Sequence, residues 1–146
     1  MSLRAFRMVL VALATLPLIG VGCRSRDPVS EPEGKVRLQK LLRLYTVYVE
    51  RNKKGPPDEQ ALRDLFAKLS EKERDELLIG DDLDSLFTGA RDGQKHGVRY
   101  GVPLDPGMSP QAIAWEAAGK KGMRFVALST GYVEEYDDET FREYKK

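Results

Sequence analysis

Cys23 has the most reactive side chain in this sequence, and it is the only cysteine among the 146 residues. A thiolate is a strong nucleophile that can accept a lipid group as a thioether, whereas hydroxyl groups react far more slowly. A single thiol cannot close an internal disulfide or build a multi-cysteine zinc site. Covalent lipid attachment is therefore the chemistry that this position could serve.

The residues before Cys23 are arranged like a secretion signal. Arg4 and Arg7 precede the apolar run 8–21, in which Thr15 is the only polar side chain. A positively charged stretch followed by a short apolar stretch is typical of a signal peptide. As a helix the run would rise only about 21 Å, which is short of the roughly 30 Å hydrocarbon core of a bilayer. We therefore expect a signal peptide over residues 1–22 rather than a stable transmembrane span.

Gly22 and Cys23 resemble the lipobox of bacterial lipoproteins, in which a small residue precedes the cysteine that becomes the lipidated N-terminus. The resemblance implies cleavage between Gly22 and Cys23 and a permanent anchor of two or three acyl chains on Cys23. Gly20 departs from the pattern, because the family usually has a branched residue there. The alternatives are an ordinary cleaved signal peptide with a free thiol and an uncleaved anchor. The predicted location is the bacterial cell envelope, facing the periplasm or the exterior.

Residues 23–34 separate this signal from the rest of the chain. They contain Pro28 and Pro32, alternating charges and a single large apolar residue, Val29. Such a composition buries too little apolar surface to offset the entropy of ordering. We expect a disordered tether over residues 23–34 and a single folded domain over residues 35–146.

The folded part offers two weaker candidates for site chemistry. His96 is the only histidine, and because no partner stands at metal-ligand or triad spacing, we expect a surface or loop histidine rather than a catalytic one. Asp81, Asp82 and Asp84 form an oxygen-rich cluster that could hold calcium. An EF-hand loop, however, needs a third oxygen ligand at the position that Leu86 occupies. A solvated capping turn is therefore the favoured interpretation.

The first half of the folded part is predicted to be helical. Apolar positions recur at helical spacing over residues 38–49, and Gly-Pro-Pro at 55–57 ends that helix. A second apolar stripe covers residues 62–69. Ser70 and Glu73 then have the spacing of a capping box, which predicts a short third helix to about residue 79.

The second half is predicted to form a small antiparallel sheet. Glycine-bearing turns separate short runs rich in aromatic and β-branched residues. We expect Ile113 and Trp115 to share a face of the sheet, and Asp137 or Asp138 to cap a closing helix. The fold class is therefore α+β, with one long amphipathic helix, two shorter helices, three to four strands and a short C-terminal helix. The predicted strands cover residues 98–102, 112–117, 123–128 and 132–136.

The order of motifs over residues 36–144 resembles the periplasmic domain of pseudopilin-like proteins, such as the major pseudopilins of type II secretion and the expanded planctomycete-type sets. The segments that carry it are LQKLLRLYTVYVERNKKGPP, DLDSLFTGARDG and AIAWEAAGKKGMRFVALSTGYVEEYDDETF. The resemblance implies a fold. Filament assembly is not implied, because no glutamate follows the signal and Pro28 and Pro32 interrupt the helix. We expect a monomer or weak oligomer.

Composition and motifs together favour a non-enzymatic, lipid-anchored envelope protein with a binding or structural module. Lys plus Arg number 24 against 23 Asp plus Glu, so there is no strong field for nucleic acid. Tyr45, Tyr48 and Trp115 could line a groove, but their spacing predicts core positions. We expect no cofactor and identify no small-molecule substrate. The expected partner is a membrane, with an envelope protein as a second candidate. The alternatives are a small secreted or periplasmic enzyme with an unrecognised site and a component of type II secretion or a pilus.

Overall fold

The computed structural model describes residues 32–104, 107 and 109–145. The predicted signal peptide, the cleavage site at Gly22 and the lipidation site at Cys23 lie outside the described residues, as does most of the predicted tether. Within the described part, no helix is both long enough and apolar enough to cross a membrane.

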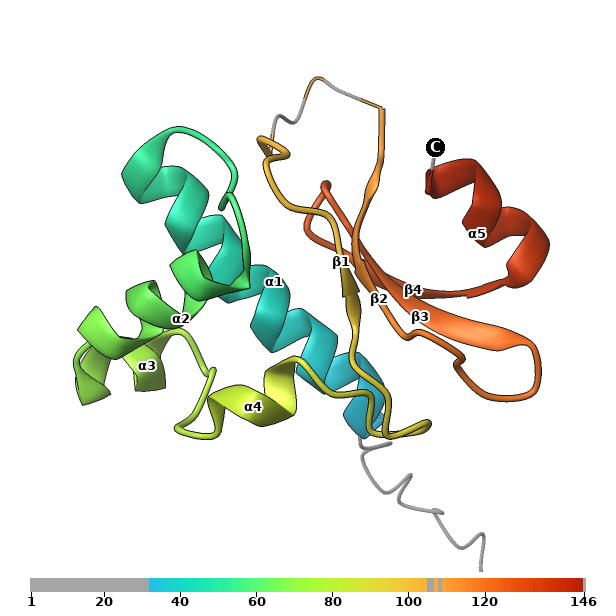
Figure 1. Cartoon of the computed structure of the whole chain (residues 1–146), viewed down its shortest axis with the longest axis horizontal. Helices are drawn as coiled ribbons and strands as arrows, with labels where there is room; N and C mark the ends of the chain where they lie inside the picture. The colour runs from blue at the N-terminus through green and yellow to red at the C-terminus, as the bar shows by residue number, and fades with distance from the viewer. Residues whose placement is uncertain (1–31, 105–106, 108, 146) are drawn as a thin grey trace, which may run out of the picture.

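The fold is α+β, as the sequence predicts. Four strands form an antiparallel sheet in the order β1-β2-β3-β4, so each strand pairs with its neighbour in the chain. Helix α1 crosses one face of the sheet and α5 lies on the other, while α2 and α4 pack against α1 (Figure 1). The elements are α1 Glu33–Asn52, α2 Glu59–Lys68, α3 Glu71–Glu76, α4 Leu83–Leu86, β1 Gly97–Val98, β2 Ala112–Trp115, β3 Met123–Leu128, β4 Val133–Asp137 and α5 Asp138–Tyr144.

Helix α1 begins earlier than its apolar stripe predicts. It starts at Glu33, directly after Pro32, so the predicted tether is wrong for its last two residues. Proline is tolerated at this position because the N–H that it lacks has no partner in the first helical turn. The carbonyl of Pro32 accepts the backbone N–H of Val36 at 3.1 Å. Glu33 also forms an ion pair with Arg37 one turn later.

The core lies between α1 and the sheet. Leu38, Leu41, Leu42 and Tyr45 of α1 are buried and belong to one apolar cluster that also contains side chains from the sheet, such as Phe125. The prediction that Tyr45 is a core residue is therefore confirmed. Because one amphipathic helix supplies much of this cluster, its apolar stripe fixes which face of the sheet is covered.

The hydroxyl of Tyr45 fastens α1 to the segment after β1. It donates to the carbonyl of Val102 at 2.8 Å and accepts the N–H of the same residue at 3.1 Å. Burial raises the pKa of this hydroxyl to about 12, with the Val102 hydrogen bond opposing the shift. The phenol is therefore neutral at physiological pH.

Replacing Tyr45 with phenylalanine should lower the free energy of unfolding by about 1 to 3 kcal/mol, because it leaves the Val102 N–H without its partner. Urea denaturation would measure the change. Tyr48→Phe is the matched control, since Tyr48 is half-buried at an open pocket and should shift stability much less. Equal effects of the two substitutions would contradict the role given to the Tyr45 hydroxyl.

Local capping signals place the short helices correctly. Ser70 and Glu73 form the predicted capping box, with each side chain bonded to the backbone of the other residue. Asp137 caps α5 by accepting the N–H of Thr140 at 2.8 Å. Helix α3 ends at Glu76 rather than near residue 79, and the short helix α4 was not predicted.

The sheet has the predicted number of strands, but two predictions about it are wrong in detail. Strand β1 covers only Gly97–Val98, because the next segment leaves the sheet to bond with Tyr45. The register of β2 against β3 shifts between Ala112 and Ala114. This bulge places Ile113 in the cluster beneath α1 and Trp115 in a second cluster beneath α5, so the two side chains do not share a face.

The two outer strands of the sheet differ in length and charge. Strand β1 is two residues long, whereas β4 is five residues long and carries Glu134 and Glu135 with exposed side chains.

The second apolar cluster covers the α5 face and includes Val126, Leu128 and Phe141. Strand β3 thus alternates between the two clusters, because Phe125 and Ala127 belong to the main cluster and Val126 and Leu128 to the second.

Candidate functional site

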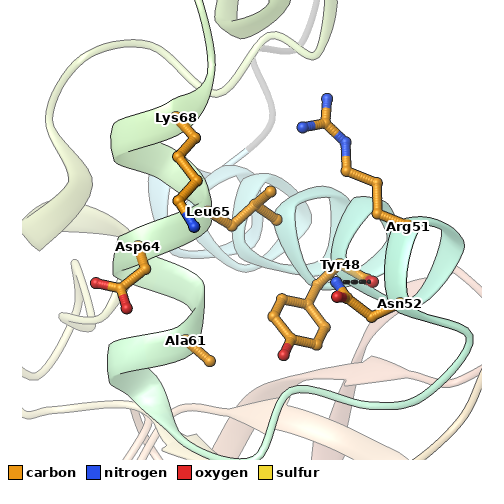
Figure 2. A pocket seen from close by; sticks show the side chains of 7 residues that line it. All are labelled: Tyr48, Arg51, Asn52, Ala61, Asp64, Leu65 and Lys68. Atoms are coloured by element: carbon orange, nitrogen blue, oxygen red, sulfur yellow. Dashed lines mark hydrogen bonds between the residues drawn. The ribbon is translucent and has the colours of Figure 1, made fainter.

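A pocket of about 300 Å³ lies between α1 and α2 (Figure 2). The aliphatic side chain of Leu65 and the ring of Tyr48 supply its apolar surface, and Figure 2 shows the ammonium group of Lys68 turned toward Leu65. The carboxylate of Asp64 points away from the pocket in the same view, and it accepts a hydrogen bond from Gln60 at 2.8 Å. The lining residues are Tyr48, Arg51, Asn52, Ala61, Asp64, Leu65 and Lys68.

The pocket combines apolar surface with a basic rim. Arg51 pairs with Glu73 of α3 at 2.8 Å, and both side chains are well exposed. The amide of Asn52 donates to the carbonyl of Tyr48 and so is committed to its own helix. None of the lining residues forms a nucleophile–base pair of the kind that covalent catalysis needs. The lining thus combines two cations, of which Arg51 is already paired, with one carboxylate and an apolar surface.

A buried ion pair lies at the other end of α1. Glu116, which is 0% exposed, follows β2, and its carboxylate accepts the Nε–H of Arg91 at 3.0 and 3.1 Å. The same carboxylate accepts the backbone N–H of Phe125 at 2.9 Å. Arg91 also pairs with Glu135 of β4, and its guanidinium lies 4.0 Å from the centroid of the Phe125 ring. This one arginine therefore joins the loop before β1 to three parts of the sheet.

The first turn of α1 packs directly on this ion pair. A Cβ atom on Gly34 would lie 2.7 Å from Oε1 of Glu116 and 3.2 Å from the Phe125 ring. Glycine is therefore required for the close approach, which explains why a residue with poor helix propensity occurs inside the helix.

His96 lies in the loop between α4 and β1, as predicted, but it is not on the surface. Only 4% of the residue is exposed. Its Nδ1 lies 2.9 Å from the carbonyl oxygen of Leu86, and its buried Nε2 has no hydrogen-bond partner in the part of the chain that the structure describes. The polar neighbours Lys95 and Gln94 suggest exposure, but packing on α4 and Phe87 determines where the ring lies.

Asp92 holds the same loop to the turn between β2 and β3. Its carboxylate accepts the backbone N–H groups of Gln94, Ala118 and Gly119, each at 3.0 Å. Burial alone would raise the pKa of Asp92, but these hydrogen bonds outweigh burial and lower it. The carboxylate is therefore ionised and fully engaged within the fold.

The three aspartates considered for calcium serve separate partners. Asp82 caps α4 by accepting the N–H of Ser85, which agrees with the favoured capping interpretation. Asp81 pairs with Arg74, and Asp84 pairs with Arg63. Among residues 32–104, 107 and 109–145, no group of three or more histidine, cysteine, aspartate or glutamate side chains is arranged to hold a metal ion.

Sequence reasoning missed Arg91 and Glu116 as a pair. A weak signal exists, because Glu116 directly ends the apolar strand AIAW, where a carboxylate needs a partner. Nothing local identifies that partner, which lies 25 residues earlier in a glycine-bounded loop.

Comparison with known proteins finds no matching family model, no matching curated protein and no matching solved structure. The resemblance to pseudopilins therefore stays a prediction from short sequence motifs.

Proposed function

We infer that this chain is a lipid-anchored cell-envelope protein whose α+β domain is a non-enzymatic binding or structural module. The observation that carries the proposal is the position of the only cysteine, directly after a short apolar run preceded by two arginines. A signal peptide explains the two arginines and the apolar run, and a lipid acceptor explains the cysteine that follows. Processing of a lipoprotein precursor accounts for both.

The start of α1 supports a membrane-proximal domain. Helix α1 begins at Glu33, so only residues 24–32 separate the domain from Cys23. Fully extended, these nine residues reach about 30 Å.

The pocket between α1 and α2 lies at the far end of the same helix. From Glu33 to Tyr48 a helix rises roughly 22 Å, so the pocket lies near the end of α1 that is farther along the chain from Cys23. This placement supports a module that presents its binding surface to the aqueous space. The lining chemistry favours binding over catalysis, since its single carboxylate, Asp64, is engaged by Gln60.

Replacing Cys23 with serine tests the anchor. We expect the wild-type protein in the membrane fraction after a carbonate wash, with an intact mass that lacks residues 1–22 and includes acyl chains. Cys23→Ser should move the protein to the soluble fraction, because the thioether cannot form. Ser25→Ala, two residues away, is the matched control and should remain membrane-bound. A Cys23→Ser protein that stays in the washed membrane would refute lipidation.

A further inference from the structure

His96 is one of the residues that hold loop 87–96, between α4 and β1, in its closed form. The backbone N–H of His96 donates to the carbonyl of Phe87 at 2.7 Å, and its ring meets the carbonyl of Leu86 at 2.9 Å. A further bond inside the loop joins the N–H of Gly89 to the carbonyl of Gln94 at 2.8 Å. The histidine therefore ties the end of the loop back to its beginning.

The environment of the ring suits a neutral imidazole. A neutral ring has a single N–H to donate, which the Leu86 carbonyl can accept, whereas an imidazolium has two N–H donors to satisfy. The second would be Nε2, which is buried and has no acceptor among the described residues. A protonated His96 would thus leave a charged donor without a partner inside the closed loop.

Charged groups from three parts of the fold act on this ring. Burial lowers the pKa of His96 below its ordinary value. The Leu86 carbonyl, the carboxylate of Glu116 after β2 and that of Asp92 in the loop itself oppose this shift, and Arg37 of α1 reinforces it. Burial outweighs the two carboxylates, since both of them are already engaged by other donors.

We propose that loop 87–96 is an acid-sensitive latch, which opens when His96 is protonated and carries Arg91 away from Glu116. Arg91 and Asp92 both belong to this loop, so its opening breaks the ion pair and the contacts to the β2–β3 turn together. The Glu116 carboxylate beside the first turn of α1 then becomes accessible. This inference does not depend on lipid anchoring.

The direction of the pH dependence follows from linkage. In the open loop the ring is solvated and has an ordinary pKa of about 6.5, whereas in the closed loop its pKa is lower. Protons therefore bind preferentially to the open form as the pH falls below about 6.5. Between about pH 7.5 and about pH 5.5 the open fraction should rise, by at most about tenfold, because the pKa of the open-state ring is about 6.5.

Amide hydrogen exchange of the full chain in detergent measures the opening. After correction for the intrinsic effect of pH, we expect protection of the Gly89, Gly93 and His96 amides to fall, by at most about tenfold, from about pH 7.5 to about pH 5.5. The Leu128 amide, which bonds to Tyr132 in the β3–β4 hairpin, is the internal reference and should keep its protection. His96 is the only histidine, so the Hε1 signal of its ring belongs to a single residue. The titration of that NMR signal reports the protonation of His96 directly.

Two variants separate the latch from general acid sensitivity. His96→Asn keeps a donor for the Leu86 carbonyl but cannot titrate, so the loop amides should lose their pH dependence. Lys95→Gln changes the neighbouring residue and should retain the pH response of the wild-type loop. The proposal is overturned if the response persists in His96→Asn, or if the wild-type loop keeps its protection at the lower pH. Should His96→Asn fail to fold, the wild-type comparison of ring titration and loop exchange still decides the question.

Discussion

Replacing Arg91 with alanine should lower the free energy of unfolding by about 3 to 5 kcal/mol, because it leaves a buried carboxylate without its cation. Glu116 is fully buried, and after the substitution only the Phe125 N–H would still bond to its carboxylate. The same substitution removes the guanidinium from the Phe125 ring and from Glu135. Urea denaturation followed by circular dichroism would measure the loss.

Arg63→Ala is the matched control for this prediction. Arg63 also has two carboxylate partners and lies 5.0 Å from an aromatic ring centroid, that of Phe87. Its partner Asp84 is exposed to water, and Glu59 retains an ion pair with Lys95 at 2.6 Å. We expect a loss of at most about 1 kcal/mol. If both arginines cost the same, the buried carboxylate is not the source of the effect.

A double replacement tests whether the charges themselves stabilise the fold. Arg91→Met with Glu116→Leu removes both charges and keeps similar volume, and such replacements of buried pairs are often neutral or stabilising. We expect the double variant to recover most of the stability lost in Arg91→Ala. Failure to recover would show that the hydrogen bond to the Phe125 backbone contributes more than the absence of an unpaired charge.

Leu42→Ala should lower the free energy of unfolding by about 2 to 5 kcal/mol, because it opens a cavity between α1 and the sheet. Leu42 is only 4% exposed and belongs to the main apolar cluster. Leu78→Ala provides the control, since Leu78 is 63% exposed and the same atoms are removed. The control should change stability by at most about 0.5 kcal/mol. An unchanged denaturation midpoint for Leu42→Ala would contradict the assignment of α1 as the core helix.

The parts of the fold that the sequence predicts correctly are those set by local patterns. The stripe that places Leu41 and Tyr45 in the core depends on helical periodicity within one segment. The caps at Ser70 and Asp137 depend on bonds between residues three positions apart. Such signals are complete within a few residues, so no knowledge of the rest of the chain is needed to interpret them.

The incorrect predictions depend on contacts between distant segments. The alternation of Ile113 and Trp115 predicts one shared face, but a bulge against β3 reverses the second side chain. Helix α1 can start as early as Glu33 because Gly34 has no side chain. Its first turn can therefore lie against the carboxylate of Glu116. The burial of His96 likewise depends on a loop closing over α4, which neither Lys95 nor its other neighbours indicate.

The candidate pocket was only partly predictable for the same reason. Helical spacing predicts that Tyr48 lies in the core; it is half-buried, packs against the main apolar cluster and also lines the pocket. The pocket depends on the packing of α2 on α1, which no local pattern contains, and the connection between these helices also packs closely on the segment after β1. A Cβ atom on Gly55 would lie 2.4 to 2.6 Å from backbone atoms of Val102 and Gly101.

The unequal outer strands of the sheet bear on aggregation. An exposed strand edge can pair with the same edge of another molecule, and copies held on one membrane would meet often. Strand β1 offers only two residues for such pairing. On β4, Glu134 and Glu135 add negative charge to the outer edge, although Glu135 is paired with Arg91, so contact between two copies of this edge would bring like charges together. Crowded molecules should therefore remain separate, and replacing these glutamates with threonine should promote intermolecular β-sheet formation.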